Sequence, residues 1–90
     1  MIKKKLLIIS GKVQGVGFRY WIQNLAINNN ISGWVKNKLS GDVEALIIGQ
    51  EKAVQKLIKQ CKIGPSSSTI QNIQINDYDQ DYLKEGFNIF

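Results

Sequence analysis

The chain has 90 residues, of which 43% are hydrophobic, and its formal net charge is +5. This length allows one domain with a modest core and excludes two, and the apolar content is typical of a folded chain, so we expect residues 1–90 to form a single domain. One cysteine and no histidine exclude an internal disulfide, a cysteine-cluster metal site and an imidazole base.

A short apolar run, Leu6 to Ile9, predicts a buried first strand over residues 6–10. The three lysines before it, at positions 3–5, are expected to form a solvated strand end. An apolar run of about four residues is too short for a secretory signal or a membrane span. We therefore expect a cytoplasmic protein.

Residues 11–20 connect this strand to a helix and hold three glycines in seven positions, Gly11, Gly15 and Gly17. Glycine allows a positive φ and lets another group approach the backbone closely. Consecutive N–H groups in such a turn form a concave nest that attracts anions, and the start of the next helix adds its positive dipole end. Apolar residues at helical spacing then predict a helix over about residues 19–28.

Arg19 is the one arginine beside eleven lysines, and it stands at the start of this helix. A cation is unfavourable there because the helix start already carries partial positive charge, and an anionic ligand would remove the conflict. A guanidinium also binds phosphate through two parallel hydrogen bonds, which an ammonium group cannot do. We therefore predict a phosphate cradle formed by the Arg19 side chain and the backbone of Gly15, Val16, Gly17, Phe18 and Arg19. The alternative is a surface arginine that stands there by chance.

The downstream sequence predicts four more strands and a second helix. The second helix is indicated by an apolar stripe and is stopped by Gly64 and Pro65. Val43, Ala45 and Ile47 share one face of the third strand. Strands are predicted at 31–38 and 42–48, joined by a tight turn at 39–41, and Gly49 is expected to end the second of these strands. A helix is predicted at 51–62, followed by strands at 69–75 and 87–90.

The predicted element order is β-α-β-β-α-β, and a short last strand follows at residues 87–90. Two crossovers carry both helices to one face of an antiparallel sheet. The expected fold class is therefore α+β, with a split βαβ, ferredoxin-like architecture.

Several reactive side chains fit a structural role better than a chemical one. Cys61 lies on the apolar stripe of the second helix and is expected to be a buried core thiol. The serines at 66–68 have no nearby base. The aspartates within residues 77–81 have the opening spacing of a calcium loop, but Tyr82 stands in place of the glycine that such a loop requires. We expect neither a metal nor a cofactor.

Residues 13–21, Val-Gln-Gly-Val-Gly-Phe-Arg-Tyr-Trp, closely resemble the signature of the acylphosphatase family. The resemblance continues through residues 33–37, 41–45, 64–65 and 87–89, in order and at the expected intervals. It covers nearly the whole chain and implies the same ferredoxin-like fold.

The resemblance also implies roles for two side chains. In acylphosphatases the arginine of this turn binds the phosphoryl group, and the asparagine of the Gly-Trp-Val-x-Asn motif positions the attacking water. These positions are Arg19 and Asn37 here. From the pattern alone, Asn37 would be a turn residue at the end of its strand.

An arginine, a carboxamide and backbone N–H groups can bind phosphate and hold a water molecule in line. They offer no general acid for a poor leaving group, so the site suits an activated compound such as an acyl phosphate. We expect a monomeric, metal-independent hydrolase that cleaves a small acyl phosphate to carboxylate and inorganic phosphate, with no membrane or nucleic-acid partner. Oxygens of the substrate phosphate would assist deprotonation of the water.

Two other functions compete with this one. An RNA-binding module of RRM-like topology shares the element order and the basic charge, but the first strand carries no aromatic residue to stack a base. RNA binding with a steep salt dependence would favour it. An accessory acylphosphatase-like domain, such as the one that begins the hydrogenase-maturation carbamoyltransferases, belongs to a long chain. Because this chain ends at residue 90, we expect a stand-alone member of the family.

Overall fold

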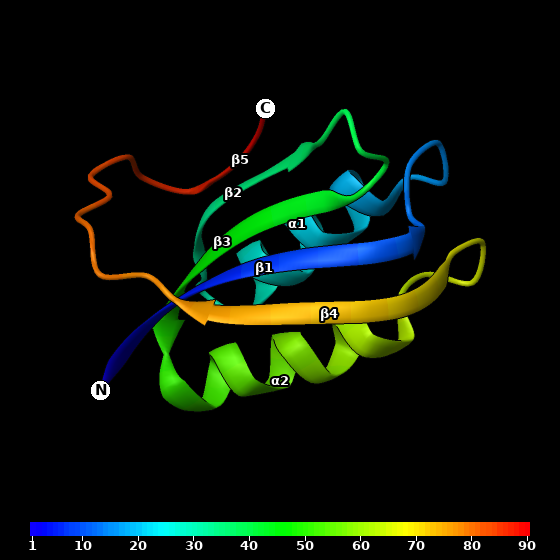
Figure 1. Ribbon diagram of the computed structural model, residues 1–90. Helices are drawn as coiled ribbons and strands as arrows, with labels where there is room; N and C mark the ends of the chain where they lie inside the picture. Colours follow the sequence, from blue (N-terminus) through cyan, green and yellow to red (C-terminus); the bar gives the residue numbers. More distant parts are fainter.

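The computed structural model describes residues 1–90 as one five-stranded sheet with two helices on one of its faces (Figure 1). The strand order across the sheet is β4-β1-β3-β2-β5. Both helices connect strands that are not neighbours in this order, as in a split βαβ fold. The elements are β1 (Ile2–Lys12), α1 (Phe18–Asn28), β2 (Ser32–Asn37), β3 (Val43–Gln50), α2 (Glu51–Ile63), β4 (Thr69–Asp77) and β5 (Phe87–Ile89).

The predicted ferredoxin-like fold class is confirmed, with one difference in the sheet. β1, β2, β3 and β4 pair antiparallel, as expected. β5 instead runs parallel to β2, with Gly33 opposite Phe87 and Val35 opposite Ile89. The prediction of an entirely antiparallel sheet was therefore wrong at this edge, because the chain passes the end of the sheet after β4 and returns beside β2 in the direction of β2 (Figure 1).

Three strands are longer than the sequence pattern predicts, and one of them, β4, continues beyond residue 75 to Asp77. β1 begins at Ile2 rather than Leu6, because Lys3, Lys4 and Lys5 pair with β3. β3 continues through Gly49, which pairs with Lys3, rather than ending there. The lysines are thus part of the sheet, and Lys5 also forms an ion pair with Asp77 of β4.

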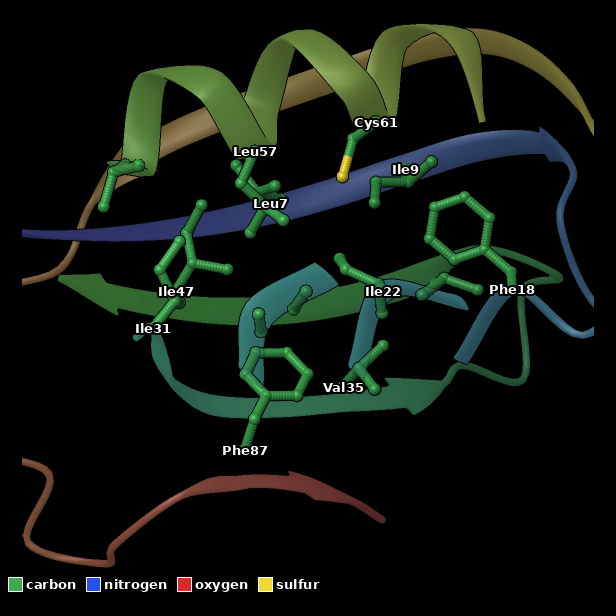
Figure 2. Packing of buried hydrophobic residues seen from close by; sticks show 14 of the residues in the cluster. Leu7, Ile9, Phe18, Ile22, Ile31, Val35, Ile47, Leu57, Cys61 and Phe87 are labelled. Atoms are coloured by element: carbon green, nitrogen blue, oxygen red, sulfur yellow. The ribbon is translucent and has the colours of Figure 1, made fainter. Parts of the chain in front are cut away.

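The core lies between the sheet and the two helices (Figure 2). Alternate residues of each strand face the helices, which is why the predicted face of Val43, Ala45 and Ile47 is fully buried. Residues at helical spacing cover that face from α1 and α2. The helix contribution consists of Phe18, Ile22, Ala26, Val54, Leu57 and Cys61.

Leu46 is also fully buried, although it lies on the opposite face of β3. Its register partners on that face are Leu6 of β1 and Trp34 of β2. The open face therefore has a small apolar centre of its own, which the alternating pattern of β3 does not predict. Neither α1 nor α2 has the length and the apolar character that crossing a membrane requires.

Burial of Cys61 leads to a test of the core. Removal from water raises the pKa of the Cys61 thiol to about 12. Because the thiolate is the species that alkylates, native protein at pH 8 should react with iodoacetamide roughly 10³-fold more slowly than a free cysteine. Mass spectrometry should show ordinary labelling once the chain is unfolded in guanidinium chloride. Rapid labelling of the native protein would contradict a buried Cys61.

Candidate functional site

The turn between β1 and α1 adopts a backbone conformation that selects glycine. Gly15 has φ +74° and Gly17 has φ +77°, both in the left-handed region that other residues rarely occupy. A Cβ atom at either position would meet no protein atom within 4 Å. The glycines are therefore required by the path of the chain rather than by crowding within the protein.

The start of α1 is unsatisfied. Gly17 caps the helix without a side-chain hydrogen bond, and the first turn contains no acidic residue. No hydrogen bond within the protein uses the backbone N–H groups of residues 15–19. α2 differs, because Glu51 lies in its first turn and the Glu51 N–H donates to the carbonyl of Met1 over 3.0 Å. The start of α1 thus has free N–H donors and no compensating charge, which are the features of helix ends that bind anions.

Arg19 lies in this first turn and is partly buried. The three ion pairs of the protein involve Lys4, Lys5 and Lys36, so the Arg19 guanidinium has no carboxylate partner. Its charge adds to the partial positive charge of the helix end. The predicted cradle residues, 15–19, are therefore brought together as one electropositive turn.

Asn37 is the last residue of β2, at the same end of the sheet as this turn (Figure 1). Strand alternation puts Asn37 on the face of Val35, which is the face that α1 covers. Phe18, the first residue of α1, packs into the core in the same cluster as Ile22 and Val35 (Figure 2). The Asn37 side chain is exposed and forms no hydrogen bond with the protein.

A side chain that the sequence analysis did not single out connects the turn to the end of β2. Gln14 donates from Nε2 to the carbonyl of Lys38 over 2.7 Å and to the carbonyl of Asp42 over 2.9 Å. Both carbonyls belong to the β2–β3 hairpin, immediately beyond Asn37 and its register partner Val43. The one available sequence signal was the position of Gln14 inside the signature, directly before Gly15.

Ser67 supports the turn from the other side. Its hydroxyl donates to the carbonyl of Val16 over 3.0 Å. This contact gives the Ser67 hydroxyl a structural role in the loop. The turn is therefore held by two other parts of the chain: the β2–β3 hairpin, through the bonds of Gln14, and the loop after α2, through Ser67.

The site is an open surface rather than a cavity. A hollow of about 490 Å³ runs along α2, and another of about 310 Å³ lies between the end of α1 and β5. Neither includes Arg19 or Asn37. The chemistry available at the turn is therefore recognition of a small anion by N–H groups, a guanidinium and a carboxamide. No group of three or more His, Cys, Asp or Glu side chains with metal-binding spacing occurs in the protein.

Comparison with known proteins shows a consistent relationship. The family model described as "Acylphosphatase" matches residues 5–89. An acylphosphatase of Rhodopseudomonas palustris (strain BisB5) is 38% identical over 77 residues, which are 86% of this chain and 78% of that protein.

Two solved structures extend the comparison. The crystal structure of acylphosphatase from Bacillus subtilis has a TM-score of 0.92 at 36% identity, over 100% of this chain and 99% of that one. Full-length HypF, in a phosphate- and nucleotide-bound form, has a TM-score of 0.87 at 30% identity, over 100% of this chain and 12% of the HypF chain. Nothing in these comparisons favours the RNA-binding alternative.

Inorganic phosphate should stabilise the folded protein, because the turn can bind phosphate without any further group. Phosphate at 100 times its Kd should add about 2.7 kcal/mol to the free energy of unfolding. Arg19→Lys keeps the charge but loses the planar fork, so its Tm should rise less at the same phosphate concentration.

Sodium chloride at matched ionic strength controls for general screening in this melting experiment. Lys59→Gln, which removes an exposed charge from α2, is the matched variant and should keep the full phosphate effect. An unchanged Tm of the parent protein in phosphate would show that the turn is not an anion site.

Proposed function

This chain belongs to the acylphosphatase family and hydrolyses acyl phosphates, and we propose that Arg19 and Asn37 are its catalytic residues. The observation that carries this assignment is the unsatisfied start of α1 beside Arg19, joined by Gln14 to the strand end that holds Asn37. The reaction is attack of water on phosphorus, with cleavage of the bond from phosphorus to the acyl oxygen. The products are a carboxylate and inorganic phosphate.

We assign phosphoryl binding to the guanidinium of Arg19 and the N–H groups of residues 15–19. These groups carry positive charge or partial positive charge, and no carboxylate of the protein competes for them. A guanidinium can hold two phosphoryl oxygens at once, which also orients the phosphoryl group. Because these oxygens are anionic throughout, Arg19 acts on both the ground state and the transition state.

We assign orientation of the attacking water to the carboxamide of Asn37. The support is its position at the end of β2, on the face covered by α1, with its side chain exposed and without a partner in the protein. A carboxamide can accept from and donate to a water molecule but cannot take its proton at neutral pH. The proton therefore passes to an oxygen of the substrate phosphate.

This set of groups defines the substrate class. A carboxylate departs without protonation, whereas an ordinary alkoxide requires a general acid, which the assigned residues do not provide. We propose that activated phosphoryl compounds are cleaved and that phosphate monoesters are not.

We further propose that residues 1–90 act as a single, monomeric domain in the cytoplasm, without a metal. All groups assigned to the reaction come from one chain, and a buried free thiol at Cys61 suits a reducing compartment. The support for metal independence is the chemistry of the donor set, since Arg19 and the N–H groups already supply the positive charge that a metal would otherwise contribute. The net charge of +5 favours approach of a small anionic substrate.

The two catalytic residues should differ in their kinetic effects with acetyl phosphate as substrate. Asn37→Ala should lower kcat by raising the activation free energy by an amount on the order of 2–4 kcal/mol, while the phosphate inhibition constant changes little. Arg19→Lys should lower kcat and also weaken phosphate inhibition, on a scale set by the roughly 10³–10⁵-fold effects of arginines in other phosphoryl transfers.

Asn76→Ala is the matched control for this series, because Asn76 is an exposed residue of β4 and should have parental kinetics. Glycerol phosphate should not be hydrolysed by any variant. If Asn37→Ala retains full turnover, Asn37 is a turn residue and its assignment is wrong.

Turnover of acetyl phosphate should persist after exhaustive dialysis against EDTA, because none of the assigned groups requires a metal. The measurement compares kcat before and after dialysis, and again after addition of Mg²⁺ or Zn²⁺. Loss of activity that a divalent ion restores would contradict the proposed mechanism.

A further inference from the structure

We propose that Gln14 is a positioning residue, which holds the Asn37 end of the β2–β3 hairpin at a set place relative to the turn at 15–19. The inference rests on the catalytic assignment of Asn37. It adds a residue that touches neither the phosphoryl group nor the water but determines where Asn37 stands.

The geometry of the two bonds carries the proposal. Nε2 of Gln14 has two hydrogens, and its two acceptors are the carbonyls of Lys38 and Asp42, at 2.7 and 2.9 Å. Lys38 follows Asn37 directly, and Asp42 precedes Val43, the register partner of Asn37. One amide group therefore donates hydrogen bonds to both arms of the hairpin, one residue beyond the Asn37–Val43 pair.

Gln14 is itself well anchored. Val13, the residue before it, is 1% exposed and belongs to the core. Gly15, the residue after it, begins the unsatisfied turn. Because Gln14 lies between the buried Val13 and the turn, its side-chain hydrogen bonds fix the hairpin relative to both the core and the turn.

The hairpin has little other support at this end. Its turn is closed by local bonds, from Lys38 N to the Asp42 carbonyl over 2.9 Å and from Gly41 N to the Lys38 carbonyl over 3.1 Å. Leu39 at its tip is fully exposed. The two bonds from Gln14 are the hydrogen bonds that join this hairpin to the turn at 13–17. Without them, Asn37 would be placed by strand pairing with Val43 and by the core packing of Val35 and Val43.

Gln14→Glu is the sharpest variant, because it keeps the size of the side chain and replaces both donors with an oxygen that faces two carbonyls. We expect kcat on acetyl phosphate to fall roughly 10–100-fold, the range seen when a group that orients a functional side chain is removed. In Gln14→Met, which removes both donors without adding a charge beside the anion-binding turn, the phosphate inhibition constant should stay within about 2-fold, since the groups that bind phosphate are untouched. In the Asn37→Ala background, the uncharged Gln14→Met should change kcat by less than about 2-fold, because its effect acts through Asn37.

Gln23 offers a matched control. Its Nε2 donates to the carbonyl of Phe87 over 2.9 Å, a bond of the same kind that ties α1 to β5 rather than to the hairpin. Gln23→Glu should lower Tm while leaving kcat within about 2-fold of the parent, as expected for a bond that is only structural. Gln14→Met, uncharged and of similar length, should reproduce the kinetic loss if Gln14→Glu does not fold.

The outcomes separate this inference from the assignment of the site. Independent, multiplicative losses of kcat in Gln14→Met and Asn37→Ala would overturn the positioning role while leaving Asn37 catalytic. A lower Tm with parental kcat in both Gln14 variants would overturn it as well. Full turnover of Asn37→Ala would overturn the catalytic assignment, and the positioning role with it.

Discussion

The free backbone N–H groups at the start of α1 are the constraint on which the proposed site depends. A helix start has free N–H groups and a partial positive charge, and proteins usually offset both with a capping side chain or an acidic residue. α1 has neither, and it carries Arg19 instead. α2 shows that this chain can compensate a helix start, because Glu51 stands in its first turn. The missing compensation at α1 leaves a place for the anionic group of a substrate, and it is the feature that links the local sequence to phosphoryl chemistry.

The rest of the fold keeps this helix start in place against the end of β2. The Phe18 side chain is buried in the core and anchors the first turn of α1. The backbone of Arg19, the next residue, is therefore held in place. β3 lies at the centre of the sheet and pairs with β2, which brings Asn37 to the same end. Gln14 then ties the hairpin back to the turn. On the proposed assignment, this small fold assembles its site from two elements without forming a cavity, because a phosphoryl group needs charge and directed donors more than it needs enclosure.

Local chemistry made some of these features predictable from the sequence and left others out of reach. Gly15, Gly17 and Arg19 indicated an anion-binding turn, since backbone freedom, helix polarity and guanidinium geometry depend on neighbouring residues alone. The proposed role of Asn37 came from family resemblance, because the strand pattern gives a turn residue as readily as a water-orienting one. The bonds of Gln14 and the parallel pairing of β5 depend on which segments meet in three dimensions. No periodicity in the sequence encodes such meetings, and the same reason explains why the burial of Leu46 was not predicted.

The central claim is that phosphate binds at the turn formed by residues 15–19. Titration of ¹⁵N-labelled protein with inorganic phosphate, followed by NMR at constant ionic strength, tests it most directly. The account predicts that the largest shift changes occur at the backbone N–H groups of residues 15–19 and at Nε of Arg19, with one saturating dissociation constant. Changes concentrated instead on the lysine-lined hollow of α2, with the turn unaffected, would contradict it.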